Sequence, residues 1–427
     1  MEPAHQPLQT GQVKEFNGAR PRALSQRPEY TSAHNKGAGR HAWLRLTPAY
    51  SVTLVHELLA DAAPERRVLD PFGGTGTTAL CAASRGHEAV SCDINPFLLW
   101  LATAKFAHYS AEDILEARDW GVTISERSNQ CELLPPPPMR NIERWWSPED
   151  LEYLRRLKTG IKTADCGAQA RDLLLVAFCR VIIERAKLTR RHQSLSFRSK
   201  GPAQFGLPLA NNPFTNALTT ILETAQTNPA TVAVARDCDA RELACIDSDS
   251  IDTVVTSPPY PNRMTSIREL RPYMYWLGFL ENPSDAGQLD WKAIGGTWGA
   301  ATHNLRKWEL PSNFYMPHMV QAAAGRIAAV AHSEERGDNA TVMSKYILRY
   351  FADLWFHTSA LYRVVRPGGN MYFVVGNSSF YGQLVETEKA LAEMFIRIGF
   401  RDVRTRALRK RSSKSELFEF VVEARKV

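Results

Sequence analysis

Short apolar runs alternate with longer amphipathic stretches along the 427-residue chain. Apolar runs at 67–70, 88–92, 231–235, 251–256 and 371–375 predict buried strands. Apolar residues at helical spacing occupy 47–59, 77–85, 346–365 and 386–399. This alternation predicts a doubly wound, Rossmann-like α/β sheet, with an antiparallel C-terminal hairpin formed by 403–407 and 417–423 at one edge.

The alternation breaks between residues 105 and 229, where the pattern is mostly helical. Ser147 followed by Pro148 marks a helix start, because serine caps helices and proline is tolerated at the first helical position. Residues 171–187 are apolar around most of a helix, which predicts a buried one. We therefore expect a large helical insertion at 105–229 and a second, irregular insertion at 282–340.

Composition and charge narrow the class of protein. At this length we expect one large domain with insertions, or two domains. Lys and Arg (52) outnumber Asp and Glu (45), and the net charge of +7 is compatible with a polyanionic partner. Seven dispersed cysteines without zinc-type spacing predict reduced thiols and no metal. No signal-peptide or membrane-spanning run is present in the sequence, so we expect a cytoplasmic protein without a membrane partner.

A glycine-rich loop, Asp70-Pro71-Phe72-Gly73-Gly74-Thr75-Gly76-Thr77, connects a predicted strand to a predicted helix. Glycines let a ligand approach the backbone closely, and the helix N-terminus presents free amide groups. The spacing Gly74-x-Gly76-x-x-Ala79 also matches the dinucleotide fingerprint. A nicotinamide cofactor is therefore one interpretation of the loop.

The acids at the strand ends favour a second interpretation. The carboxylate of Asp70 would repel a pyrophosphate but would suit the ammonium group of S-adenosyl-L-methionine. Asp93 can hold ribose hydroxyls and Ile94 can cover an adenine face in either cofactor. Asp239 is the candidate for the adenine amino group. Its neighbour Asp237 could hold that role instead, and a plain surface turn is the alternative for either residue.

The strand at 251–256 runs directly into Ser257-Pro258-Pro259-Tyr260. Prolines end ladder pairing and stiffen the backbone that follows. An exocyclic amino group on a base is a poor nucleophile, and the Ser257 hydroxyl and the Pro258 carbonyl could accept both of its N–H bonds. Tyr260 could stack on a base that has left its duplex, at a cost of roughly a few kcal/mol.

The two motifs, Asp70-Pro71-Phe72-x-Gly74-x-Gly76 and Thr256-Ser257-Pro258-Pro259-Tyr260, together resemble the amino-group DNA methyltransferases. The resemblance covers about 34–104 and 230–427. It includes a helix at 47–59, with Thr47 as N-cap, that is similar to the family's pre-loop motif. The serine form of the tetrapeptide resembles the cytosine-N4 branch, whereas adenine-N6 enzymes more often carry Asp there.

This resemblance implies a methyltransferase that uses S-adenosyl-L-methionine to methylate N4 of a flipped cytosine in double-stranded DNA. It implies a prokaryotic, nucleoid-associated enzyme of restriction–modification or related systems, with a cognate restriction endonuclease as a candidate partner. The predicted catalytic residues are Ser257, Pro258, Pro259 and Tyr260. The predicted cofactor-binding residues are Thr47, Asp70, Pro71, Phe72, Gly74, Gly76, Thr77, Asp93, Ile94, Asp239 and Ala240.

Three other functions remain open. An adenine-N6 DNA methyltransferase has the same machinery with a different pocket. RNA guanine-N2 methyltransferases share the Asp-Pro-Phe-x-Gly-Thr-Gly loop, although they usually carry Asp before the two prolines and an added N-terminal RNA-binding domain. A non-catalytic DNA-binding protein is the alternative of another class.

Three basic stretches compete for contacts with DNA: 187–200, 263–271 and 404–414. We favour Arg263, Arg268, Arg190, Arg191 and the loop residue Trp298. The helical block departs from the family pattern, because it falls between Asp93 and Asp239.

The predicted segments are a flexible N-terminal arm (1–33), a cofactor-binding half (34–104), a helical insertion that would read DNA (105–229), a catalytic half (230–281), a DNA-contacting insertion (282–340) and the remainder of the domain (341–427).

Overall fold

The computed structural model describes residues 24–46, 50–60, 62, 65–127, 132–189, 196–197, 212–262, 267–296, 300–333, 337–411 and 416–427. The chain divides into two compact units, and each is described by itself. The loop unit contains the glycine loop and comprises Arg27–Ala240 and Arg263–Trp308. The tetrapeptide unit contains Ser257–Tyr260 and includes Arg241–Asn262 and Glu309–Val427.

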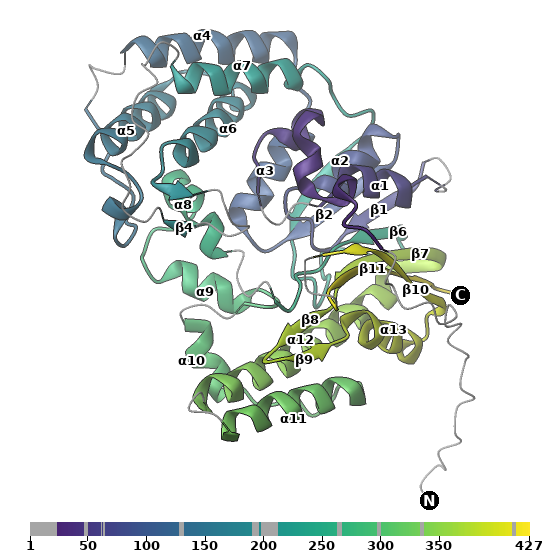
Figure 1. Cartoon of the computed structure of the whole chain (residues 1–427). Coiled ribbons are helices and arrows are strands. Elements are labelled where there is room, and N and C mark those ends of the chain that lie inside the picture. The colour runs from purple at the N-terminus through teal and green to yellow at the C-terminus, as the bar shows by residue number, and fades with distance from the viewer. Residues whose placement is uncertain are drawn as a thin grey trace, which may run out of the picture. The chain divides into compact units, whose positions relative to one another are not determined.

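The strands of the two units, each taken by itself, confirm the predicted α/β fold (Figure 1). The loop unit contributes three parallel strands in the order β1-β2-β5: β1 (Arg67–Asp70), β2 (Glu88–Asp93) and β5 (Ala233–Asp237). The tetrapeptide unit contributes β10-β11-β7-β6: β6 (Ile251–Thr256), β7 (Val365–Gly376), β10 (Arg401–Lys410) and β11 (Phe418–Arg425). Strands β6 and β7 are parallel, and β10 and β11 form the predicted antiparallel edge hairpin.

The helical insertion is confirmed in the loop unit, where four helices pack together (Figure 1). They are α4 (Ala111–Arg127), α5 (Pro148–Thr163), α6 (Ala168–Glu184) and α7 (Pro213–Ala225). The Ser147 hydroxyl accepts the Asp150 N–H at 3.1 Å and caps α5, as the sequence predicts. Nine residues of α6 are buried, which agrees with its apolar circumference.

The remaining elements of the loop unit are short. Before the insertion come the 3₁₀ turns η1 (Pro28–Tyr30), η2 (Ser32–Gly37) and η3 (Gly39–Ala42), then α1 (Val52–Leu58), α2 (Thr77–Ser84) and α3 (Pro96–Phe106). Within it lie η4 (Ile142–Arg144), β3 (Leu188–Thr189) and β4 (Ser196–Phe197). Three helices of this unit come later in the chain: α8 (Ile267–Leu277), α9 (Asp285–Lys292) and α10 (Ala300–Lys307).

Aromatic contacts join α8 to α3 and to the insertion. The Tyr273 ring stacks on Phe97 of α3 with centroids 4.9 Å apart. The Trp276 ring meets Trp146 and Phe178 edge-on at 5.7 and 5.6 Å. Each such pair contributes about 0.5–1.5 kcal/mol beyond its area burial. The segment that follows the tetrapeptide in sequence is therefore anchored in the core of the helical insertion.

The helices of the tetrapeptide unit are α11 (His318–Ser333), α12 (Gly337–Val364) and α13 (Thr387–Ile398), and a small hairpin is formed by β8 (Ser378–Phe380) and β9 (Gln383–Val385). Helices α11 and α12 run side by side (Figure 1). All six residues of β6 are buried, as expected for a central strand. Strand β6 thus delivers Ser257 from the interior of this unit.

Several details of the predicted elements are wrong. The stretch 282–340, predicted as irregular, contains α9, α10 and α11, and α12 begins at Gly337 rather than at 346. Helix α1 begins at Val52 with Ser51 as its N-cap, because the Asn35 side chain holds the Tyr50 carbonyl and the Val52 N–H at 2.9 and 3.0 Å; Thr47 itself lies outside the described residues. Strand β5 lies two residues later than predicted, at Ala233–Asp237. Strand β7 begins at Val365 rather than at 371, and residues 366–369 form a bulge inside it, since Ile251 pairs with Val365 but Thr253 pairs with Asn370.

The cysteines only partly follow the prediction of reduced thiols. Cys81, Cys92, Cys166 and Cys179 are free, whereas Cys238 and Cys245 are disulfide-bonded. Both bonded residues lie in the loop after β5, where chain folding can bring cysteines together without a recognisable spacing motif. No helix among the described residues is long and apolar enough to cross a membrane.

Candidate functional site

The glycine loop of the loop unit forms a tight turn between β1 and α2. The Gly73 N–H donates to the Cys92 carbonyl of β2 at 2.8 Å, and the Gly76 N–H donates to the Gly73 carbonyl at 2.8 Å. Gly76 has a φ of +77°, and a Cβ there would lie 2.7 Å from the Phe106 ring. Both the conformation and the close contact require glycine at this position.

Asp93 connects this loop to the end of β2. Its Oδ2 accepts the Gly74 N–H at 3.0 Å, and its Oδ1 accepts the Asn95 N–H at 2.8 Å. Burial is the main reason that the pKa of Asp93 rises to about 6, and the Asp237 carboxylate adds a smaller increase. Each carboxylate oxygen has a second lone pair, so the side chain can hold the loop and still accept from a ligand.

Asp70 and its neighbours shape the start of the loop. Asp70 is only 1% exposed, and its Oδ1 accepts the Phe72 N–H at 3.1 Å. Pro71, Gly74 and Thr77 are buried, whereas Phe72 is partly exposed. The carboxylate thus fixes the turn, and its contact with an ammonium group stays a prediction.

Parallel pairing brings the acids of β1, β2 and β5 to one edge of the sheet. Asp93 and Asp237 are register partners, and Asp70 pairs with Ser91, two residues before Asp93. Asp239 lies two residues beyond the end of β5 and is partly buried. Ala240 is buried, and Ile94 is partly buried. The choice between Asp237 and Asp239 stays open.

Lys105 of α3 is a loop contact that the sequence analysis missed. Its side chain is 1% exposed, and its Nζ donates to the Thr75 carbonyl at 3.0 Å. Arg40 anchors the same end of α3 by donating to the carbonyls of Lys105 and Ala107 at 2.9 and 2.5 Å. The available signal was one charged residue in the otherwise apolar stretch 96–106.

Burial lowers the pKa of Lys105 to about 7 from 10.5, and this gives a testable pH dependence. Below pH 7 the lysine is charged in both the folded and the unfolded chain, so folding bears the whole cost of burying the charge. Between pH 7 and 10.5 the folded chain releases the proton, and the stability of the wild type relative to Lys105→Met is expected to rise. Urea unfolding of both proteins across this range measures the change, with exposed Lys162→Met as the control; a flat difference would contradict the burial effect.

In the tetrapeptide unit, Ser257–Tyr260 leaves the end of β6 and is held by two tyrosines of α12. The Tyr350 hydroxyl donates to the Pro259 carbonyl at 2.8 Å, and the Tyr346 hydroxyl donates to the Pro261 carbonyl at 2.7 Å. Within the described part of the chain no donor reaches the Pro258 carbonyl. The backbone that follows the Pro258 carbonyl, the acceptor selected from the sequence, is therefore fixed.

The Tyr260 side chain is held as well. Its hydroxyl donates to Glu419 Oε1 at 2.7 Å, and the Arg411 guanidinium lies 4.7 Å from the ring centroid. Burial, followed by the negative charge of Glu419, raises the pKa of Tyr260 well above its usual value, and a hydrogen bond with the Ser257 side chain acts weakly in the other direction. The phenol therefore stays protonated.

Two arginines of the C-terminal basic stretch have structural partners. Arg409 binds Glu419 through Nε at 2.7 Å, and Arg411 donates to the Asn377 carbonyl at 2.7 Å. Neither belongs to a solvated basic surface. Glu419, Tyr346 and Tyr350 were all missed from sequence, although an acid inside the apolar strand 417–423 and two tyrosines four residues apart on one helix were available signals.

The predicted DNA contacts are mostly outside the described residues. This holds for Arg190, Arg191, Arg263 and Trp298, and for the predicted cofactor residue Thr47. Arg268 lies in the first turn of α8 and is exposed. Its neighbour Arg271 packs over the Trp145 ring at 5.2 Å, so only part of this basic stretch faces solvent.

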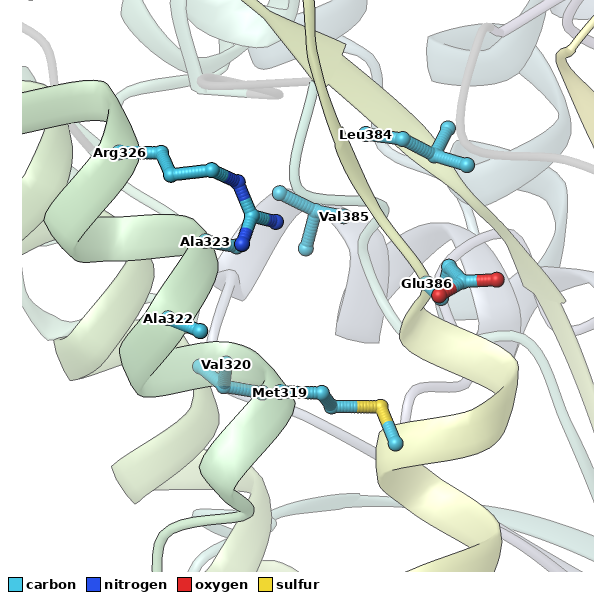
Figure 2. Close-up of a pocket in the computed structure, with 8 residues that line it drawn as sticks. All are labelled: Met319, Val320, Ala322, Ala323, Arg326, Leu384, Val385 and Glu386. Carbon is cyan, nitrogen blue, oxygen red and sulfur yellow. The ribbon is translucent and has the colours of Figure 1, made fainter.

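A small pocket of the tetrapeptide unit lies between α11 and residues 384–386, at the end of β9 and just before α13 (Figure 2). Its lining is mostly apolar, and it includes Arg326, whose Nε donates to Gln383 at 2.9 Å. No predicted site residue lines it. We assign it no part in the candidate site.

Comparisons with known proteins agree with the two motifs. No protein-family model matches the chain. The chain is 24% identical to the Type II methyltransferase M.BsoBI of Geobacillus stearothermophilus, over 89% of the chain and 82% of that protein. It is 21% identical to M.AvaI of Anabaena variabilis, over 86% and 80%, and 20% identical to M.MvaI of Kocuria varians, over 79% and 76%.

Among solved structures, an rRNA methyltransferase from Streptomyces viridochromogenes, AviRa, aligns with 88% of the chain and 86% of its own length. Its TM-score of 0.27 and identity of 11% are too low to bear on the fold. The comparison therefore rests on the sequence relatives, since three Type II methyltransferases each align with more than three quarters of the chain. They confirm the resemblance of this chain to the amino-group DNA methyltransferase family.

Proposed function

We propose that this chain is a site-specific DNA methyltransferase that uses S-adenosyl-L-methionine to methylate the N4 amino group of a flipped cytosine. The observation that carries the proposal is the fixed tetrapeptide. Tyr350 and Tyr346 occupy the carbonyls of Pro259 and Pro261, while the described residues leave the Pro258 carbonyl for another donor. The Type II methyltransferase relatives support methyl transfer to DNA in a restriction–modification or related setting.

The residues of the tetrapeptide suit the activation of an amino group. The Ser257 hydroxyl and the Pro258 carbonyl would accept its two N–H bonds and hold its lone pair toward the methyl donor. Pro258 and Pro259 lack amide hydrogens, so neither of these two positions offers a backbone donor that could occupy the acceptors. Tyr260 would hold the base by stacking. The serine in the first position supports cytosine over adenine as the target.

The carboxylate acceptors of the loop unit fit the proposed cofactor. Two carboxylates, Asp70 and Asp93, end neighbouring strands, and acceptors of this kind suit an ammonium group and ribose hydroxyls better than a pyrophosphate. Ile94 would cover the adenine, and Asp239 or Asp237 would accept its amino group. When bound, S-adenosyl-L-methionine supplies a methyl group on a positively charged sulfur.

Double-stranded DNA is the proposed partner, and Arg268 supports its placement near α8. Phosphates on either side of a flipped base attract arginine, and Arg268 is exposed on the helix that follows the tetrapeptide in sequence. We propose that the helical insertion reads the DNA sequence, because α8 is packed into it through Trp276.

The proposal is tested by identifying the methylated nucleoside. The chain is incubated with radiolabelled S-adenosyl-L-methionine and either duplex DNA or RNA, and the nucleic acid is digested and separated. We expect label in N4-methylcytosine from DNA. Label in N6-methyladenine would overturn the cytosine assignment, and label confined to RNA would overturn the DNA assignment.

Replacing Asp93 by alanine is expected to weaken cofactor binding about tenfold or more, because two loop hydrogen bonds and the proposed ribose acceptor disappear together. Wild-type affinity should also fall below about pH 6, since protonation removes the charge of the Asp93 carboxylate. Calorimetric titration with S-adenosyl-L-methionine measures both effects. Glu88→Ala, at the exposed start of the same strand, is the control, and unchanged affinity in Asp93→Ala would refute the ribose role.

A further inference from the structure

The Tyr260 hydroxyl lies within a row of four side chains in the tetrapeptide unit. Ser257 hydrogen bonds with Tyr260, and the Tyr260 hydroxyl donates to Glu419 Oε1 at 2.7 Å. Arg409 then holds both oxygens of Glu419, with Nε 2.7 Å from Oε2 and Nη2 3.2 Å from Oε1. We call this arrangement the Tyr260 row. It links the edge hairpin to the serine of the tetrapeptide.

The chemistry of each group sets the direction of the bonds along the Tyr260 row. A guanidinium is only a donor, and a carboxylate bridged to it is only an acceptor, so the phenol proton of Tyr260 points at Glu419. The phenol oxygen then offers Ser257 nothing but lone pairs, and the hydroxyl proton of Ser257 must point at Tyr260. Ser257 therefore presents lone pairs and no proton to a further group.

The ring of Tyr260 is held in place. Arg411 lies over one of its faces at 4.7 Å and is anchored by the Asn377 carbonyl at 2.7 Å and by Asn262 Oδ1 at 3.2 Å. At Gly376, a Cβ would lie 2.5 Å from Arg411 and 3.1 Å from the Tyr260 ring. The absence of a side chain at this position thus makes room for both groups, and the second face of the ring is the one a base would use.

We infer that Glu419 and Arg409 are positioning residues that fix Ser257 as a hydrogen-bond acceptor, so that the site selects a base with an amino group over its carbonyl counterpart. The inference rests on the proposed function. An amino group donates to Ser257, whereas a carbonyl oxygen in its place would face another acceptor. Buried donors and acceptors left without a partner weaken binding by about 5- to 150-fold.

Replacement of Glu419 by glutamine tests the inference, because an amide can donate to the phenol oxygen. The phenol proton can then turn to Ser257, and Ser257 can donate to a carbonyl. The probe is a duplex with the methylated base identified above, compared with the same duplex carrying uracil for cytosine or hypoxanthine for adenine. Binding is measured with S-adenosylhomocysteine present, so that no turnover occurs.

We expect the wild type to prefer the amino base about tenfold or more and Glu419→Gln to lose most of that preference. Tyr260→Phe keeps the ring but removes the hydroxyl that connects Ser257 to Glu419, and it should lose the preference as well. Glu423→Gln, four residues further along β11 in a 3.8 Å surface pair with Arg406, is the matched control and should keep it. Affinity for S-adenosylhomocysteine should be unchanged in all three variants.

The outcomes separate this inference from the proposed function. If the wild type methylates DNA but Glu419→Gln and Tyr260→Phe keep its preference, the inference is wrong and the proposed function stands. Equal loss of affinity for both duplexes would also overturn it, since that is what a purely structural role predicts. If the wild type methylates no DNA, the proposed function fails and the inference fails with it.

Discussion

Ser257→Ala is expected to lower the rate of methyl transfer about 100-fold while leaving the affinity for S-adenosyl-L-methionine unchanged. Removing one preorganised hydrogen-bonding group at a reacting centre typically costs that much in turnover. Ser257 belongs to the tetrapeptide unit and the glycine loop to the loop unit, so the substitution does not alter the residues proposed to hold the cofactor. Single-turnover kinetics and calorimetric titration measure the two quantities separately.

Ser250→Ala is the matched control for this experiment. Ser250 precedes β6, as Ser257 follows it, and its hydroxyl donates only to the exposed Asp247 carbonyl at 2.8 Å. We expect nearly wild-type turnover from it. Equal losses of turnover and cofactor affinity in Ser257→Ala would show that the serine serves the fold rather than the reaction.

Gly76→Ala is expected to destabilise the fold by about 2–5 kcal/mol and to abolish measurable cofactor binding. A left-handed conformation costs an alanine about 1–2 kcal/mol, and overpacking against the Phe106 ring adds about 1–3 kcal/mol. Relief of the clash must move either α3 or the loop, and Asp93 already ties the loop to β2 through Gly74. Urea unfolding and calorimetric titration measure the two effects.

Gly86→Ala is the control that separates the conformational cost of Gly76→Ala from the cost of its contact with Phe106. Gly86 also has a positive φ, of +86°, but nothing lies within 4 Å of the Cβ that the substitution would add. It should lose only the conformational part, about 1–2 kcal/mol, and should keep its affinity for the cofactor. If Gly76→Ala behaved in the same way, the contact with Phe106 would have no role in shaping the loop.

The sheet could be predicted from sequence because its strands leave strong local patterns. The bounds of β1 and β6 match the prediction to the residue, since both are short apolar runs that end at a glycine loop or at two prolines. Helix α1 was misplaced because the Asn35 side chain, fifteen residues before Tyr50, decides where it begins. Long-range side-chain contacts of this kind have no sequence period.

The candidate site divides in the same way. The residues predicted to touch the cofactor or the base stand in contiguous motifs, so the glycine loop and the tetrapeptide could be found from sequence. The residues that hold them come from elsewhere: Lys105 is 30 positions from Thr75, and Glu419 is 159 positions from Tyr260. Only folding brings such pairs together, and a single sequence does not record which buried charge meets which loop.

The placement of Trp276 between Trp146 and Phe178 bears on attempts to change the target sequence by exchanging parts between relatives. A chimaera that received a foreign helical insertion alone would leave the indole of Trp276 facing side chains selected for a different neighbour. Helix α8 comes after the tetrapeptide in the chain, yet it packs as a piece of the insertion. The transferable module is therefore discontinuous in sequence, and a functional exchange must move α8 together with the helices that hold it.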